Sequence, residues 1–249
     1  MAIEINLENK IALVTGGTRG IGKSIVEELL NAGAKVYATG TNLIQINKLN
    51  EENKNPLLNY LQLELSDVNN VKDFIKKIIN LSIIDILVNN AGINIISNAD
   101  EISYEDFLKI QQINVHGPFL LSQAFGKQML ERKWGRIINI SSIWSVVTRP
   151  ARLSYSASKM SLLGINKTLA IEWAKSNVLV NSVSPGFTLT ELTKKTNTKE
   201  ELKIIETKIP QNRLAYPKEI ANGVLFLSSN LNSYIVGQNL IIDGGYTAI

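Results

Sequence analysis

The chain contains no cysteine and a single histidine, His116, among its 249 residues. The absence of cysteine excludes disulfides, thiolate nucleophiles and cysteine-based metal sites together. With one imidazole in the chain, a zinc site is not expected either, and we place His116 on the surface or in helix packing. The sequence therefore predicts no metal site.

Long apolar runs and dense charge of one sign are also lacking. No run reaches the ~18 apolar residues that a transmembrane helix needs, and the amino-terminal segment has neither the basic stretch nor the apolar core of a signal peptide. The net charge is only +4, and we interpret the lysines between 194 and 203 as a solvated helix face. We therefore expect a cytoplasmic protein with no membrane or nucleic-acid partner.

Short apolar runs, typical of buried strands, alternate with longer amphipathic patterns, typical of helices. Strands are expected at 11–15, 35–39, 57–63, 83–88, 136–140, 178–183 and 239–242, and helices at 22–32, 43–53, 68–80, 104–132, 154–176 and 217–229. This alternation predicts right-handed βαβ units in a doubly wound α/β fold, with one parallel sheet covered by helices on both faces. Because no linker interrupts the pattern, residues 1–249 are interpreted as a single domain. A kink or break is expected at Gly117 and Pro118.

A glycine-rich segment, Thr-Gly-Gly-Thr-Arg-Gly-Ile-Gly over 15–22, joins the first strand to the first helix. Glycines there permit a tight turn and bring the backbone close to a pyrophosphate at the helix N-terminus. The spacing Gly-x-x-x-Gly-x-Gly differs from the general dinucleotide fingerprint. We interpret the segment as a nucleotide site, the alternative being a purely structural turn.

The end of the second strand indicates which nucleotide is preferred. A site for NAD usually presents an Asp or Glu there to the ribose hydroxyl, whereas residues 38–42 read Ala-Thr-Gly-Thr-Asn. Arg19, inside the glycine turn, could instead pair with a 2′-phosphate; the alternative is an ordinary surface arginine. The sequence favours NADP(H) over NAD(H).

Tyr155 and Lys159 are four residues apart and follow Ser142 within one segment. At this spacing the two side chains share a helix face, so the ammonium can approach the phenol and favour its ionised form. Such a pair alone is weak evidence, because it also arises on ordinary exposed helices. Its weight comes from the accompanying Asn-Asn-Ala-Gly over 89–92 and Pro-Gly at 185–186.

Taken in order, these motifs resemble those of the short-chain dehydrogenase/reductase family over nearly the whole chain. The family's glycine motif is matched by Thr15, Gly16, Gly20 and Gly22, its helix Asn by Asn114, its catalytic residues by Ser142, Tyr155 and Lys159, and its adenine-contacting pair by Asp67 and Val68. The resemblance implies a Rossmann-type sheet of about seven strands, with a cofactor half at about 8–142, a catalytic and substrate half at about 143–249, and a mobile helical lid at about 187–209. It implies cofactor contacts from Gly16, Thr18, Arg19, Gly20, Ile21, Gly22, Thr41, Asp67, Val68, Asn90, Ala91, Gly92, Tyr155, Lys159, Pro185, Gly186, Thr188 and Thr190.

The resemblance also implies a mechanism. Tyr155 would exchange a proton with the carbonyl or alcohol oxygen, and Ser142 would polarise the carbonyl. Lys159 would bind the nicotinamide ribose and keep Tyr155 acidic. Asn114 would hold a water that connects Lys159 to solvent; it could also satisfy the broken helix near Gly117.

For the substrate, the chain most resembles 3-oxoacyl-[acyl-carrier-protein] reductases, and a small or medium 3-oxoacyl compound, free or as a thioester, is expected. Lys133 matches one basic carrier-docking residue of those enzymes, but the second falls on Ser176. Trp144, Arg149 and Arg152 would equally suit a sugar, a polyol-derived carbonyl or an acid, or could be surface residues. A catalytically silent regulatory protein is the alternative of another class.

A homo-oligomer, most simply a tetramer, is expected from the two helices at 104–132 and 154–176. They carry many apolar residues, namely Phe107, Ile110, Leu121, Phe125, Leu162, Leu163 and Ile165. In the family that the chain resembles, the equivalent helices pair across a two-fold axis.

Overall fold

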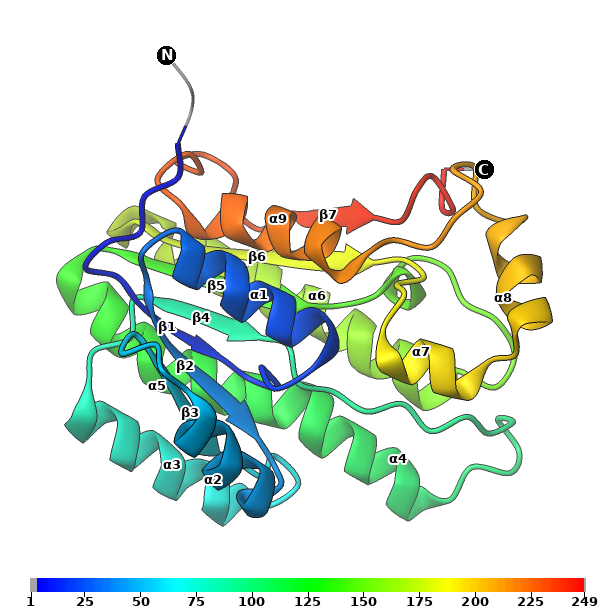
Figure 1. The fold of residues 1–249 in the computed structure, drawn as a ribbon, viewed down its shortest axis with the longest axis horizontal. Coiled ribbons are helices and arrows are strands. Elements are labelled where there is room, and N and C mark those ends of the chain that lie inside the picture. Colours follow the sequence, from blue (N-terminus) through cyan, green and yellow to red (C-terminus); the bar gives the residue numbers. More distant parts are fainter. Residues whose placement is uncertain (1–3, 249) are drawn as a thin grey trace.

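Seven parallel strands form one sheet with the order β3-β2-β1-β4-β5-β6-β7 in the computed structural model, which describes residues 4–248 (Figure 1). The strands are β1 Ile11–Val14, β2 Lys35–Gly40, β3 Leu58–Gln62, β4 Ile86–Asn89, β5 Gly135–Ile140, β6 Val178–Pro185 and β7 Asn239–Ile242. Every strand pairing is parallel. The order reverses between β1 and β4, which confirms the doubly wound sheet and marks the position where such folds bind ligands.

The helices cover both faces of this sheet. They are α1 Gly20–Asn31, α2 Leu43–Glu52, α3 Val68–Leu81, α4 Tyr104–Gln111, α5 Gly117–Arg132, α6 Leu153–Trp173, α7 Glu191–Thr196, α8 Lys199–Glu206 and α9 Pro217–Ser228, with short turns η1 Gln112–His116, η2 Ile143–Ser145 and η3 Ala174–Ser176. Helices α1 and α9 pack together on one face, whereas α3, α5 and α6 contribute to the core on the other. The parallel strands are therefore buried on both sides.

Each strand divides its side chains between two hydrophobic cores. In β1, Ala12 and Val14 enter the core beneath α1 and α9, and Leu13 enters the core beneath α3 and α5. Successive strand residues point to opposite faces, so a strand covered on both sides is apolar throughout rather than alternating. This explains the unbroken apolar runs in the sequence.

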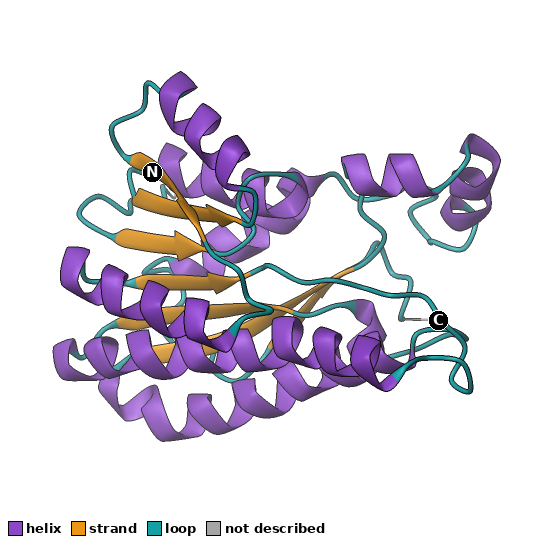
Figure 2. Cartoon of the chain, turned by 90° about the horizontal axis from the view of Figure 1, so that it is seen from below, coloured by secondary structure: helices purple, strands orange, loops and turns teal. Residues whose placement is uncertain are grey.

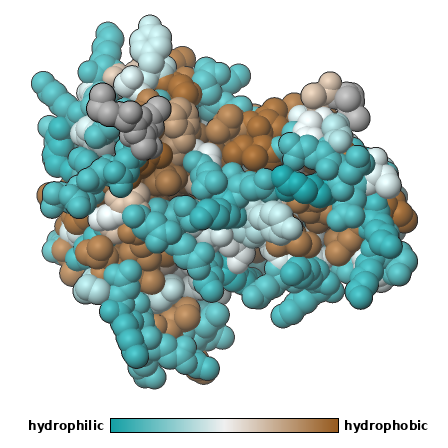
Figure 3. All heavy atoms as spheres, turned by 45° about the horizontal axis from the view of Figure 1, so that its top comes forward, coloured by the Kyte–Doolittle hydropathy of each residue, from teal (hydrophilic) through white to brown (hydrophobic). Residues whose placement is uncertain are grey.

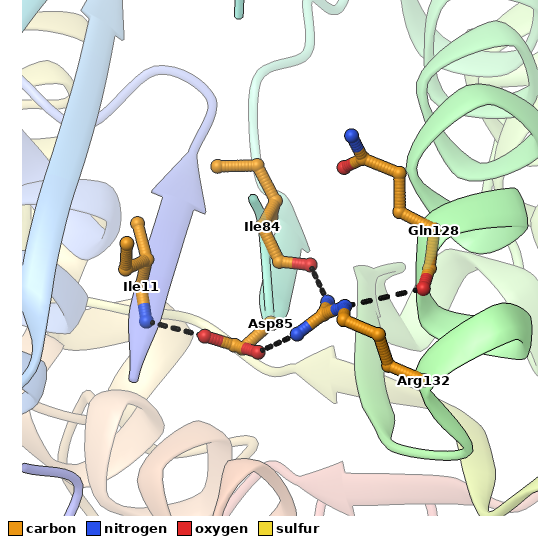
Figure 4. A network of polar contacts seen from close by, with 5 residues as sticks. All are labelled: Ile11, Ile84, Asp85, Gln128 and Arg132. Carbon is orange, nitrogen blue, oxygen red and sulfur yellow. Dashed lines mark hydrogen bonds and ion pairs between the residues drawn. The ribbon is translucent and has the colours of Figure 1, made fainter. Parts of the chain in front are cut away.

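At the amino end of the sheet, the buried Asp85 joins three elements (Figure 4). Its Oδ2 accepts a hydrogen bond of 2.9 Å from the backbone N–H of Ile11, and its Oδ1 pairs with Nη1 of Arg132 on α5 at 2.5 Å. The same guanidinium donates to the carbonyl oxygens of Ile84 and Gln128. The carboxylate thus fixes β1, β4 and α5 against one another.

The helix predicted over 104–132 is not broken at Gly117 and Pro118. Instead, α4 continues through one π-helical turn, Gln112–His116, into α5, and the proline lies in the first turn of α5, where a missing backbone N–H is tolerated. A π turn widens the helix locally, and such turns are frequent at functional sites. Asn114 lies within this turn.

The segment expected to form a lid contains two short helices, α7 and α8, which lie beyond the carboxyl ends of β6 and β7 at the right of Figure 1. Its mobility stays a prediction.

Within residues 4–248, no helix combines the length and apolar character needed to cross a membrane.

Candidate active site

A cleft of about 880 Å³ lies where the loops that follow the strands meet, at the end toward which the strand arrowheads point in Figure 2. The predicted cofactor residues that line it are Gly16, Thr18, Arg19, Gly20, Ile21, Gly22, Thr41, Asn90, Ala91, Gly92, Tyr155, Lys159, Pro185, Gly186, Thr188 and Thr190. Ser142 lines it too. Loops separated by more than 100 residues of sequence therefore converge at one place, as the resemblance predicts.

The glycine turn forms a cradle that admits no side chain at its centre. Gly16 has a φ of +65°, and a Cβ on Gly22 would lie 2.1 Å from the carbonyl oxygen of Gly16. Asn90 supports the turn from β4, donating from Nδ2 to the carbonyl oxygens of Thr15 and Gly16 at 2.9 and 3.1 Å. Because no side chain caps the N-terminus of α1 at Arg19, its first N–H groups can meet a pyrophosphate. The residues present fit a dinucleotide.

The end of β2 fits the phosphorylated form of such a dinucleotide. Gly40, Thr41 and Asn42 line the cleft there without a carboxylate, and the exposed Arg19 lines it from the glycine turn. An acidic side chain at this place would repel a 2′-phosphate, whereas a guanidinium can bind it.

The cleft lining after β3 differs from one sequence prediction. Asp67 and Val68 do not line the cleft; Glu64 and Leu65 do. Asp67 is instead the N-cap of α3, and its Oδ1 accepts hydrogen bonds from the backbone N–H groups of Asn69 and Asn70. Since β3 ends at Gln62, the residues that follow it directly occupy the edge of the cleft. The Asp-Val pair comes later in the chain, where α3 begins.

Ser142, Tyr155 and Lys159 meet at the inner end of the cleft. Ser142 follows β5, Tyr155 lies in the first turn of α6, and both side chains line the cleft. Burial raises the pKa of Tyr155 above its usual 10, while the neighbouring Ser142 hydroxyl and the charge of Arg152 oppose that rise. The phenol is therefore protonated at neutral pH and can donate a proton.

The Lys159 ammonium is buried beside this pair. Its Nζ lies 5.6 Å from the centre of the Tyr155 ring and donates a hydrogen bond of 2.7 Å to the carbonyl oxygen of Ile140. Burial lowers the pKa of Lys159 from its usual 10.5 to about 8. The spacing of four residues thus places the two side chains together, as predicted from the helix period.

Asn114 reaches the site through the loop after β4 rather than from the cleft itself. Its side chain accepts from the backbone N–H of Ile93 and donates to the carbonyl oxygen of Ile93 and to the Ser158 hydroxyl, at 2.9 to 3.0 Å. A Cβ on Gly92 would lie 3.2 Å from Asn114 Oδ1 and 3.4 Å from Lys159 Nζ. The amide therefore clamps this loop between η1 and α6 and holds Gly92 against the lysine.

Three aromatic rings pack against one another at the cleft. Trp144 and Phe187 line the cleft, and Tyr246 contacts both rings edge to face, with centroids 5.3 to 6.2 Å apart. Arg149 lies 5.4 Å from the Trp144 ring. Sequence reasoning missed Phe187 and Tyr246; their only signal was an aromatic residue directly after Pro185-Gly186 and after the glycine pair 244–245.

Comparisons with known proteins agree with this geometry. A family model described as enoyl-(acyl carrier protein) reductase matches residues 16–247. The chain is 39% identical to the 3-oxoacyl-[acyl-carrier-protein] reductase FabG of Aquifex aeolicus, covering 98% of this chain and 99% of that protein. It is 35% identical to an NAD-dependent glycerol dehydrogenase of Listeria innocua, covering 98% and 96%. A crystal structure of gluconate 5-dehydrogenase from Burkholderia cenocepacia, in complex with NADP and tartrate, superposes with a TM-score of 0.89 at 28% identity, covering 98% and 97%.

Proposed function

The chain belongs to the short-chain dehydrogenase/reductase family, the NAD(P)-dependent oxidoreductases of carbonyls and alcohols, and we propose that it is an NADP(H)-dependent reductase of 3-oxoacyl-type carbonyls. The observation that carries this proposal is the meeting of Ser142, Tyr155 and Lys159 beside a glycine cradle in one cleft. A silent binding protein would not require a buried, protonated phenol beside a serine hydroxyl and a lysine ammonium in that cleft.

The residues support a direct proton transfer. When bound, NADPH would supply the hydride for the carbonyl carbon. Tyr155 donates its hydroxyl proton to the carbonyl oxygen, and Ser142 donates a hydrogen bond to the same oxygen, which stabilises the charge that develops there. Lys159, on the same helix face, binds the cofactor ribose and favours the ionised phenol after transfer. Asn114 holds the loop that orients Lys159.

NADP(H) is the proposed cofactor, because Arg19 and the carboxylate-free end of β2 suit a 2′-phosphate. The Burkholderia relative holds NADP, whereas the Listeria relative is named NAD-dependent, so the preference needs a direct test. Arg19→Ala should weaken NADPH binding about 10- to 100-fold without affecting NADH, by loss of a charge-assisted hydrogen bond. Lys23→Ala, which removes an exposed lysine paired with Glu27 on α1, is the control. Tighter binding of NADH by the wild type would reject the assignment.

Two substrate classes are supported by different observations. The 3-oxoacyl class comes first because of the 39% identity to FabG. A sugar or polyol derivative is the second candidate, favoured by the aromatic rings of Trp144 and Phe187 and by the glycerol and gluconate dehydrogenases among the relatives. Lys133 is exposed and available to a carrier protein. The second docking position, however, is occupied by Ser176, which is uncharged.

The test compares NADPH oxidation with acetoacetyl carrier protein, acetoacetyl-CoA, acetoacetate and a panel of keto-sugars. Turnover of an acetoacetyl compound supports the first class, and turnover confined to keto-sugars supports the second. An enzyme that binds NADPH yet turns over no carbonyl would point to the regulatory alternative.

The proposal extends to assembly and location. Exposed apolar side chains on α5 and α6, among them Phe119, Met160 and Ile171, support a homotetramer that pairs these helices. Hydrophobic patches between hydrophilic areas are also visible on the face of the molecule drawn in Figure 3. We also propose a cytoplasmic enzyme whose segment 187–209 closes over substrate as a lid.

A further inference from the structure

Arg152 is a buried cation without a partner. It immediately precedes α6 and is 7% exposed, and its Nε and Nη1 atoms have no hydrogen-bond acceptor among the described residues. None of the ion pairs formed within residues 4–248 involves this side chain. Two other buried cations are better satisfied: Lys159 and Arg136 both donate to backbone carbonyl oxygens, although Nε of Arg136 also lacks an acceptor.

Such an arrangement is unfavourable for the protein alone. A buried guanidinium with free N–H groups loses hydration without replacing it, which is among the more costly polar arrangements in a folded chain. Arg149 adds a like charge nearby, and burial and then this charge lower the pKa of Arg152. Ala151 precedes it with a φ of +62°, a backbone conformation that alanine rarely adopts. A bound anion would satisfy the free donors and offset the repulsion.

The position of Arg152 relates this anion to the reaction. Arg152 precedes Tyr155 by three residues at the start of α6, and its charge acts on the phenol. The guanidinium of Arg149, in the same loop, lies over the ring of Trp144, and Trp144 lines the cleft. An anionic group between the loop and the phenol would therefore be part of the molecule whose carbonyl Tyr155 protonates.

We propose that Arg152 is a specificity-determining residue that binds an anionic oxygen group of the substrate, a carboxylate or a phosphate. The inference rests on the proposed carbonyl reduction and narrows it, because the substrate is then a free acid or phosphate ester rather than a neutral thioester group. Nε and Nη1 are shielded from solvent and Arg152 does not itself line the cleft, so its side chain or the loop before α6 must shift when the anion enters.

Matched substrates test this directly. Acetoacetate is compared with its neutral methyl ester, and fructose 6-phosphate with fructose, in NADPH-dependent turnover by the wild type, Arg152→Gln and Arg152→Lys. The wild type should prefer the charged member of at least one pair, which identifies the anion as carboxylate or phosphate. Arg152→Gln should lower kcat/KM for that anion about 10- to 100-fold more than for its neutral partner, the value of one charge-assisted hydrogen bond; the ratio of the two losses separates anion binding from any effect of the charge on Tyr155. Arg152→Lys should restore part of the loss, and Lys167→Gln, on the exposed side of α6, should change neither.

Equal losses for charged and neutral substrates in Arg152→Gln would overturn the inference and assign Arg152 to the acidity of Tyr155 or to folding. A wild-type preference for the neutral member of both pairs would overturn it as well. If no carbonyl is reduced, the proposed function fails, and calorimetry with malonate on the NADPH-loaded protein still decides the anion site. Binding of malonate by the wild type, absent in Arg152→Gln, supports the site; equal binding by both proteins rejects it.

Discussion

At the scale of single residues, the environment of Tyr155 determines which proton the enzyme can move. Burial raises the pKa of the phenol, so the hydroxyl is intact at neutral pH. We expect Tyr155→Phe to reduce kcat about 10²–10⁴-fold, the usual contribution of a positioned acid, while the dissociation constant of NADPH stays within about threefold of wild type. Stopped-flow turnover and fluorescence titration measure the two quantities. A variant that keeps more than a tenth of the wild-type rate would remove Tyr155 from the proton transfer.

Lys159 links the site to the pH dependence of stability. Burial lowers the pKa of its ammonium from 10.5 to about 8, so between these pH values the unfolded chain binds more protons here than the folded chain. The free energy of unfolding therefore rises with pH across that window. Lys159→Met lacks this titration, so its stability relative to wild type should fall by about 3 kcal/mol between pH 7 and pH 10.5, at 1.36 kcal/mol per pKa unit.

Urea denaturation at several pH values measures this difference. Lys167→Met replaces an exposed lysine on the same helix, and its stability should follow that of the wild type throughout. Should Lys159→Met also run parallel to wild type, the ammonium is not buried in the way the structure indicates.

At the scale of elements, the glycine turn works because a side chain at its centre is impossible. A Cβ on Gly22 would lie 2.1 Å from the carbonyl oxygen of Gly16, so Gly22→Ala must shift the turn away from the first N–H groups of α1. We expect NADPH affinity to fall more than about tenfold, since the pyrophosphate depends on close backbone approach. Gly164→Ala is the matched control, because a Cβ there would meet no atom within 4 Å, and its affinity should be unchanged. Equal affinities in both variants would contradict the cradle.

The opposite end of the sheet allows stability to be tested apart from catalysis. Asp85→Ala leaves the N–H of Ile11 and the guanidinium of Arg132 without their acceptor, which should cost about 3 kcal/mol of unfolding free energy. The kcat should be unchanged, because the cleft lies at the carboxyl ends of the strands. Asp73→Ala breaks a solvent-exposed pair with Lys76 and should cost less than about 0.5 kcal/mol. Chemical denaturation with parallel turnover assays checks both. If Asp85→Ala lost little unfolding free energy, the contacts of Asp85 would not contribute to stability.

At the scale of the whole molecule, the apolar residues first expected to form an interface are mostly core. Ile110, Leu121, Phe125 and Leu162 are buried within one chain, whereas Phe107, Leu163 and Ile165 are half-buried. The side chains free to pair with another copy are different ones on the outer faces of the same helices, such as Met160 and Ile171.

We therefore expect sedimentation at micromolar concentration to give about four times the 27.5 kDa chain mass. Met160→Glu combined with Ile171→Glu should shift the protein to smaller species, because charge is costly in an apolar interface. Ile44→Glu, at an equally exposed apolar position on α2, should leave the mass unchanged. A wild-type monomer would refute the pairing of α5 and α6.

The sequence by itself determined those features that depend on residues close together in the chain. Helix and strand periods located the elements within a few residues, and the four-residue spacing placed Tyr155 and Lys159 on one helix face. The glycine turn could also be read directly, since its backbone demands are local. A motif match was misleading where the position depends on how the chain runs in space. The Asp-Val pair at 67–68 fits the family motif, but β3 ends at Gln62, and it is Glu64 and Leu65 that line the cleft.

Only the tertiary structure decided which distant groups meet and which of them are left without partners. Arg152 in the sequence is indistinguishable from a surface arginine; its burial depends on how the loop after η2 folds against α6. Asn114 becomes a clamp only because a π turn aims its amide at the loop after β4. Burial and hydrogen-bond satisfaction are properties of contacts between segments far apart in the chain, so no local pattern encodes them.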